Sequence, residues 1–188
     1  LKIQYHTISG LRRDGVHVCR LLGDPPPSFA DLAAGRPRRY LRPVGCPPAA
    51  YFPTTIPWAD VAEDTSVEIV VTEGELKAAA AAKHGHAAIS IPGVDAWRSQ
   101  RRGWSLLPEF EDIKWVGRQV VLAFDSDASA KPEVIRALTA AASEWRSLGA
   151  TVSITSVPEI PGVEKAGIDD LIVERGPAAL QSLLEEAT

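Results

Sequence analysis

Short apolar runs alternate with helix-forming stretches from about residue 66 onward, and this rhythm constrains the fold more than any other feature. An apolar run of roughly four to eight residues between turn signals is typical of a strand covered on both faces. The expected strands are residues 67–72, 87–91, 120–124 and 151–157. The expected helices are residues 75–83, a stretch from Pro132 to near Gly149, and a stretch beginning at Pro177. The alternation predicts an α/β, Rossmann-like fold with a central parallel sheet flanked by helices.

The first 65 residues lack the alternation of apolar runs and helix-forming stretches. We expect them to form a small basic β-rich subdomain ahead of an α/β domain at 66–188. Turn signals such as Asp14-Gly15, and proline-rich connectors, separate short apolar segments. Residues 1–50 carry eight basic and three acidic side chains, although the whole chain has a net charge of −4. A basic arm beside an acidic body suits a protein that binds phosphates in one place and metal ions in another. The alternative is a dipolar surface without a function.

The length of 188 residues favours one compact domain with a small appendage. No stretch approaches the roughly 18 apolar residues of a membrane-spanning helix, and no signal-peptide pattern opens the chain, so we expect no membrane protein. Two cysteines are too few for a disulfide scaffold or a four-thiolate zinc site, which makes a reducing cytoplasm the expected location. Because the chain begins at Leu1 and contains no methionine, we expect it to be a piece of a longer polypeptide.

Acidic residues follow several of the expected strands at the point where each strand ends. They are Glu73 after the first strand, Asp125 and Asp127 after the most apolar strand, and Asp169 and Asp170 after the last strand and its loop. In an open parallel sheet such positions meet at one edge, where ligands bind. Carboxylates brought together repel one another unless a cation intervenes, and hard oxygen ligands suit Mg²⁺ or Mn²⁺. The sequence therefore predicts a metal site and, with it, phosphoryl or nucleotidyl transfer.

Each of these acids also has a structural alternative. Glu73 could be the acidic residue that the dipole at a helix N-terminus favours. Asp125 and Asp127 could belong to a turn ahead of the next helix, because aspartate favours turns. For Asp169 and Asp170, capping of a following short helix explains the residues nearly as well as metal binding does.

The segments 70–75 and 122–127 resemble the two leading motifs of the TOPRIM domain, which bacterial-type DNA primases, topoisomerases and some nucleases share. Glu73 matches the family glutamate after the first strand. Asp125 and Asp127 match the family's Asp-x-Asp pair. The resemblance implies a TOPRIM fold for residues 66–188, with these three acids as catalytic and metal-binding residues and Mg²⁺ or Mn²⁺ as the cofactor.

Residues 165–170 look like the acidic element that lies downstream in the primases, which implies that Asp169 and Asp170 add to the metal site. The nearer likeness is to TOPRIM-like domains in replication proteins of phages, plasmids and mobile genetic elements, which often begin with Glu-Gly-Glu-x-Lys-Ala. One departure is Lys77, since many primases have an aspartate at this position. A lysine cannot bind a metal ion, so the number of ions is open. Lys77 could instead neutralise Glu73 or hold a substrate phosphate.

The N-terminal part resembles the small basic subdomain that precedes TOPRIM in primases, where cationic residues guide template and nucleotide. By this likeness, and because a guanidinium fork pairs well with phosphate, we expect phosphate contacts from Arg20, Arg38, Arg39 and Arg42. The alternative is a solvated basic loop. Primases commonly carry zinc-binding cysteines upstream, so we expect a zinc-binding or helicase domain elsewhere in the longer polypeptide.

These motifs lead to a primase-like catalytic core that binds single-stranded DNA template and nucleoside triphosphates and makes primers by metal-dependent nucleotidyl transfer. Two alternatives stay open: the same acids could cut nucleic acid, or the chain could be a non-catalytic module that binds nucleic acid or nucleotides. Aspartyl-phosphate chemistry at Asp125 is a weaker option. Trp97 and Trp104 lie among arginines and could stack on single-stranded bases, although anchoring of the 95–118 stretch is the favoured role.

Overall fold

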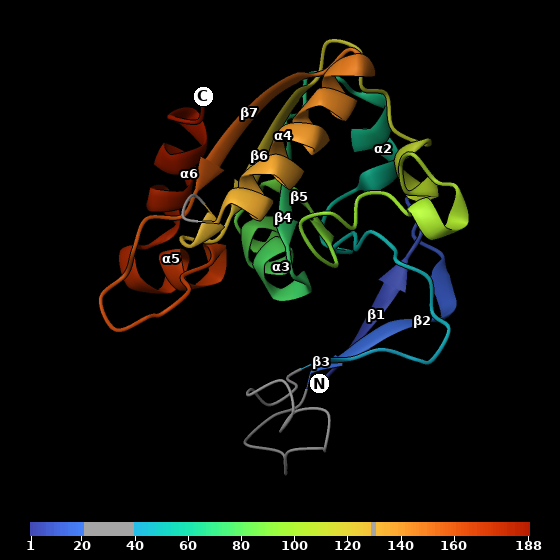
Figure 1. Ribbon diagram of the computed structural model, residues 1–188, viewed down its shortest axis with the longest axis horizontal. Coiled ribbons are helices and arrows are strands. Elements are labelled where there is room, and N and C mark those ends of the chain that lie inside the picture. Colours follow the sequence, from blue (N-terminus) through green and yellow to red (C-terminus); the bar gives the residue numbers. More distant parts are fainter. Residues whose placement is uncertain (21–39, 129–130) are drawn as a thin grey trace.

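A computed structural model describes residues 1–20, 40–128 and 131–188 (Figure 1). Its centre is a four-stranded parallel sheet with the strand order β5-β4-β6-β7. The strands are β4 (Ile69–Glu73), β5 (Ala87–Ile91), β6 (Gln119–Phe124) and β7 (Thr151–Ser156). The predicted α/β fold with a central parallel sheet is confirmed, and the predicted strands are all present, with some ends shifted by a residue or two.

Helices cover both faces of this sheet because its strands are apolar on both sides. They are α2 (Trp58–Glu63), α3 (Glu75–Lys83), α4 (Pro132–Ser147), α5 (Ile168–Arg175) and α6 (Pro177–Glu185). On one face Val71 and Leu122 pack with α2 and α4, and on the other Val70 and Val121 pack with α3, α5 and α6. Neighbouring residues of one strand therefore face opposite layers. Among the helices that the structure describes, none has the length and apolarity that a membrane span needs.

The connection from β4 to α3 is a single residue, and a glycine makes this sharp corner possible. Gly74 has a φ of +99°, a backbone conformation that side chains with a Cβ rarely adopt. The corner places Glu73 at the end of the strand and Lys77 in the first turn of the helix, at the same edge of the sheet.

The stretch between β5 and β6 contains two short 3₁₀ turns, η1 (Gln100–Arg102) and η2 (Pro108–Phe110). Trp97 is 2% exposed, and its ring centroid lies 6.0 Å from that of Trp145 in α4. Trp104 is partly buried against the same core. The predicted anchoring role of these tryptophans is confirmed.

The N-terminal residues form a separate antiparallel sheet in the order β1-β2-β3, as expected for a β-rich part. Its strands are β1 (Lys2–His6), β2 (Arg12–Arg20) and β3 (Tyr40–Leu41). The predicted turn at Asp14-Gly15 is wrong, because both residues lie within β2, where Gly15 adopts a φ of +75° near an irregularity in the pairing with β1. Figure 1 shows this sheet beside the yellow-green stretch between β5 and β6, to which Arg13 is joined by an ion pair with Glu109.

The segment that follows the small sheet packs with the main body. Phe52 and Trp58 are buried in the same core as β4 and β6, and Tyr51 pairs with Ser90 of β5. Helix α2, which the sequence analysis did not predict, belongs to this segment. Residues from Tyr51 onward therefore pack with the parallel sheet.

Candidate active site

Two acidic residues lie where neighbouring strands of the parallel sheet end. Strand β4 ends at Glu73, and Asp125 directly follows β6, with which β4 pairs. Because the strands are parallel, both residues reach the carboxyl edge of the sheet, where ligands bind in such folds. Asp125 is only 4% exposed, and a carboxylate buried this deeply needs positively charged partners.

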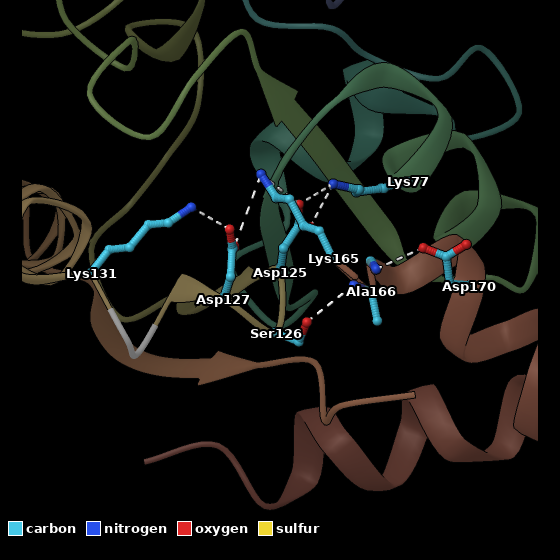
Figure 2. A network of polar contacts seen from close by, with 9 residues as sticks. Lys77, Asp125, Ser126, Asp127, Lys131, Lys165, Ala166 and Asp170 are labelled. Carbon is cyan, nitrogen blue, oxygen red and sulfur yellow. Dashed lines mark hydrogen bonds and ion pairs between the residues drawn. The ribbon is translucent and has the colours of Figure 1, made fainter. Parts of the chain in front are cut away.

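Two ammonium groups supply these partners (Figure 2). Lys77 Nζ lies 2.5 and 2.6 Å from the two carboxylate oxygens of Asp125. Lys165 Nζ reaches in from the loop before α5 and lies 3.1 Å from Oδ2 of Asp125 and 4.0 Å from Oδ1 of Asp127. The Lys77 side chain is 19% exposed and that of Lys165 is 45% exposed, so solvent screens the Lys77 pair less.

The pKa values of this cluster reflect the mutual charges. Burial lowers the pKa of Lys165, but its hydrogen bond to Asp125 and the charges of Asp125, Glu73 and Asp127 raise it above its ordinary value. All three acids are therefore within electrostatic reach of one ammonium group. Asp127 also forms an ion pair with Lys131. Burial raises the pKa of Asp127, and the two lysines lower it by more, which keeps this carboxyl ionised.

The acidic pair at the start of α5 divides into two roles. Asp170 Oδ2 accepts a hydrogen bond from the Gly167 backbone N–H at 2.9 Å, which caps the helix. Asp169 lines the cavity that contains Asp125, and its buried Oδ1 has no donor among the described residues. Burial and the charge of Asp170 raise the pKa of Asp169, and Lys77 offsets only part of this effect. The capping alternative thus describes Asp170, whereas Asp169 is free for a ligand.

The loop that carries Lys165 is fastened to the residues after β6 by two hydrogen bonds. The Ser126 N–H donates to the Ala166 carbonyl, and the Ala166 N–H donates to Ser126 Oγ, both at 3.0 Å. Next to them, Gly167 leaves room for Lys77, because a Cβ at this position would overlap the Lys77 side chain. Lys165, Ser126 and Gly167 were not predicted as members of the site, and their only signal was their place inside the two acidic motifs.

A buried polar network joins the N-terminal sheet to α3. Nη2 of Arg42 donates to the Tyr5 hydroxyl and to Oε1 of Glu75, both at 2.9 Å. The Tyr5 hydroxyl itself donates to Glu75. Burial, together with the Glu75 charge, holds the pKa of Tyr5 well above its ordinary range. Arg42, a predicted phosphate contact, therefore also holds the two parts of the molecule together.

The other predicted phosphate contacts lie on or near the same sheet. The Cζ atom of Arg20 lies 5.8 Å from the ring centroid of Tyr40, a residue that lines the cavity. Arg38 and Arg39 lie outside the described residues. The structure thus places Arg42 at the cavity and Arg20 next to one of its walls.

Acids and bases meet in a cavity of about 400 Å³ between the carboxyl edge of the parallel sheet and the N-terminal strands. Its charged lining consists of Glu73, Glu75, Asp125, Asp169, Lys77, Lys165 and Arg42. Asp127 does not line this cavity and instead borders a second one, of about 630 Å³, formed with the loop at 159–164. The charges of all three predicted catalytic acids therefore act on Lys165, but Asp127 lines a different cavity from Glu73 and Asp125.

The donor atoms at the cavity fit a hard divalent cation in kind, since they are carboxylate oxygens, and the unpartnered Oδ1 of Asp169 is a ready ligand. The oxygens of Asp125, however, point at ammonium groups. Within residues 1–20, 40–128 and 131–188, no three acidic, histidine or cysteine side chains are grouped closely enough to form a metal site. The residues thus suit a divalent cation by their chemistry, while both oxygens of Asp125 contact lysines.

Sequence comparison connects the chain to proteins whose names give no activity. The family model described as a domain of unknown function, DUF3854, matches residues 57–179. An uncharacterized protein of Picosynechococcus sp. is 31% identical over an alignment of 138 residues, and the match covers 66% of this chain. The chain spans only 13% of that relative.

Solved structures of bacterial primases have a similar fold. The DnaG catalytic core has a TM-score of 0.63 at 19% identity, and the RNA polymerase domain of Mycobacterium tuberculosis primase DnaG has 0.64 at 18%. A DnaG catalytic domain bound to single-stranded DNA has 0.61 at 20%. These matches cover 100%, 98% and 100% of this chain but only 52%, 54% and 52% of the primase chains. The predicted primase-like fold is confirmed, and the chain spans about half the length of these structures.

Proposed function

This chain belongs to the DUF3854 family, and we propose that it is the core of a primase-like nucleotidyltransferase that makes primers on single-stranded DNA. The observation that carries the proposal is a cavity at the carboxyl edge of a primase-like sheet, in which Glu73, Asp125 and Asp169 face Lys77 and Lys165. Acids suit a cation and lysines suit phosphates, and a nucleoside triphosphate with its metal ion needs both.

Glu73, Asp125 and Asp127 are the residues that would hold Mg²⁺ or Mn²⁺, with Asp169 as a further donor at the cavity. Asp170, which caps α5, is left out of this set. A bound divalent ion supplies positive charge to the triphosphate and to the oxygens that attack and leave. Asp125 is buried at the end of a central strand, so its carboxylate is already oriented before any ligand arrives.

The lysines orient the triphosphate through charge-assisted hydrogen bonds to its oxygens. The two hydrogen bonds between Ser126 and Ala166 fix the backbone next to Lys165, which keeps its side chain at the edge of the cavity. The arginines of the N-terminal part, with Arg20 and Arg42 in the described structure, line the approach for the template. The DnaG domain that binds single-stranded DNA supports the same class of template here.

Primer synthesis on single-stranded DNA with labelled ribonucleotides and Mg²⁺ tests the proposal. Asp125→Asn removes a charge at nearly constant volume and is expected to abolish the product. Asp112→Asn changes an exposed aspartate between β5 and β6 and is the matched control, which should keep full activity. Circular dichroism shows that each variant is folded. Full primer synthesis by Asp125→Asn would contradict the proposal.

The same reactions without nucleotides separate the two alternative functions. A nuclease shortens the labelled single strand in the presence of Mg²⁺, whereas a primase leaves its length unchanged. A non-catalytic module retards the strand in a gel without changing it and makes no primer when nucleotides are added.

A further inference from the structure

Two ammonium groups lie among the three carboxylates of the predicted metal site. Lys77 contacts both oxygens of Asp125, and Lys165 approaches Asp125 and Asp127 together. Glu73 contributes the third carboxylate, and its charge acts on Lys165. Most of the negative charge that attracts a divalent ion is therefore already balanced by the protein's own cations.

We propose that Lys77 and Lys165 are exchangeable counter-ions, which balance Asp125 while the site is free of nucleotide and move to phosphate oxygens when a metal-bound triphosphate enters. The carboxylate oxygens that the lysines leave then become available to the metal ion. This inference rests on the proposed function, since it takes the ligand to be a nucleoside triphosphate. Its consequence is that metal and triphosphate bind as a coupled pair.

A divalent ion that arrives alone has to displace an ammonium group from Asp125. The Lys77 side chain is only 19% exposed, so it would lose its carboxylate partner without regaining full hydration. The displaced ammonium would also remain close to the incoming positive charge. Both effects weaken binding of the metal ion by itself.

A triphosphate that arrives alone meets the opposite obstacle. The carboxylates of Glu73, Asp125 and Asp169 line the same cavity and repel it, while the lysines stay engaged with Asp125. When both ligands arrive, each lysine exchanges a carboxylate for a phosphate oxygen and each freed carboxylate gains the metal ion. Every charge then keeps an opposite partner, and linkage requires that each ligand raises the affinity for the other by the same factor.

The geometry of the site permits this exchange without a change in the backbone. Lys77 and Lys165 both line the cavity of about 400 Å³ that would hold the triphosphate. The aliphatic part of Lys77 crosses Gly167, where the absence of a Cβ leaves space for it. Lys165 is 45% exposed, and hydrogen bonds between Ser126 and Ala166 hold the adjacent backbone, so its ammonium group can change partners while the loop stays in place.

Two binding measurements on the whole chain test the exchange. Mn²⁺ binding without nucleotide is followed by the electron paramagnetic resonance of free Mn²⁺, and binding of a fluorescent non-hydrolysable ATP analogue is followed with Mn²⁺ present. Lys77→Gln is expected to bind Mn²⁺ alone about tenfold more tightly than the wild type and the Mn²⁺-bound analogue about tenfold more weakly. Lys83→Gln, which removes an exposed lysine at the far end of the same helix, is the matched control and should change neither affinity.

Opposite changes in the two affinities support the exchange, because a merely structural role of Lys77 would weaken both. Tight binding of Mn²⁺ alone by the wild type, or no gain in Lys77→Gln, overturns it. Lys165→Gln alters a more exposed side chain and gives the same test in a variant with less risk to folding. Coupled binding without primer synthesis would refute the proposed function alone, and primer synthesis without coupled binding would refute the exchange alone.

Discussion

Arg118 is a fully buried arginine at the entrance to β6, and we expect its removal to weaken the scaffold of the site. Its side chain is 0% exposed. The guanidinium donates to four backbone carbonyls: Lys114 and Val67 at 2.7 Å each, Val61 at 2.8 Å and Ala62 at 3.1 Å. One side chain thereby joins the end of α2, the connection to β4 and the start of β6.

The cost of losing these contacts follows from the number of carbonyls left without a donor. Arg118→Met keeps the aliphatic stem and removes all four hydrogen bonds, and each buried carbonyl without a donor costs about 1–3 kcal/mol. Burial lowers the pKa of Arg118, which reflects the cost of keeping its charge away from water, and the substitution relieves that cost. The Ala62 carbonyl keeps the Lys114 N–H as a donor, so three carbonyls are left without one. The lower end of the range then gives a loss of about 3 kcal/mol in the free energy of unfolding. A loss of this size is a large fraction of the roughly 5–15 kcal/mol that stabilises a domain.

Urea denaturation followed by tryptophan fluorescence measures this loss. Arg118→Lys keeps the charge but not the planar fork and should fall between the wild type and Arg118→Met. Arg136→Met, on the exposed side of α4, is the control and should stay within about 0.5 kcal/mol of the wild type. If Arg118→Met lies within about 1 kcal/mol of the wild type, the four hydrogen bonds do not hold the scaffold as argued.

Three further predictions concern the acidic edge. The raised pKa of Asp169 means that folding favours its protonated form, so the stability it contributes is present below about pH 4 and is lost as the pH rises through the folded pKa. Asp169→Asn should therefore melt at a higher temperature than the wild type at neutral pH and at the same temperature near pH 3, as read by calorimetry. The lowered pKa of Asp127 has the opposite sign, with stability that is lost only as the pH falls through the folded value, and Lys131→Ala should move this pKa upward in an NMR titration of the carboxyl group. Gly167→Ala should push Lys77 off its carboxylate partner and give tighter binding of Mn²⁺ alone, measured by paramagnetic resonance, whereas unchanged binding would show that the lysine simply shifts aside.

The sheet could be predicted from the sequence because its strands are continuous apolar runs bounded by glycine, proline and acidic residues. The ends of α3 and β5 coincide with the prediction, since Gly74 opens the helix and Gly85 lies just beyond its last residue. Helix α2 was missed because its six residues are too few to show a helical period. The turn predicted at Asp14-Gly15 is instead an irregularity within β2, where the pairing with β1 shifts register and Gly15 adopts a positive φ.

From the sequence, only those site residues could be placed that lie at the ends of predicted strands. Parallel neighbouring strands bring Glu73 and Asp125 to one edge, and this follows from the strand pattern. Which way Asp127 faces, and whether Asp169 or Asp170 caps α5, depends on loop conformations that no period in the sequence specifies. Those roles therefore become clear only in the folded structure.

The departure at Lys77 explains how an acidic edge can be stable before any cation binds. Carboxylates at the ends of buried strands repel one another. Without a bound metal ion or another positive charge, this repulsion would lower the stability of the fold. The pairing of Asp125 with Lys77 and Lys165 removes the cost, because a buried charge with a close counter-ion is far less unfavourable than one without a partner. The same pairing opposes any ion that approaches without a ligand for the lysines. In the proposed exchange, stability in the absence of metal and discrimination in favour of a metal-bound phosphate thus have a single electrostatic cause.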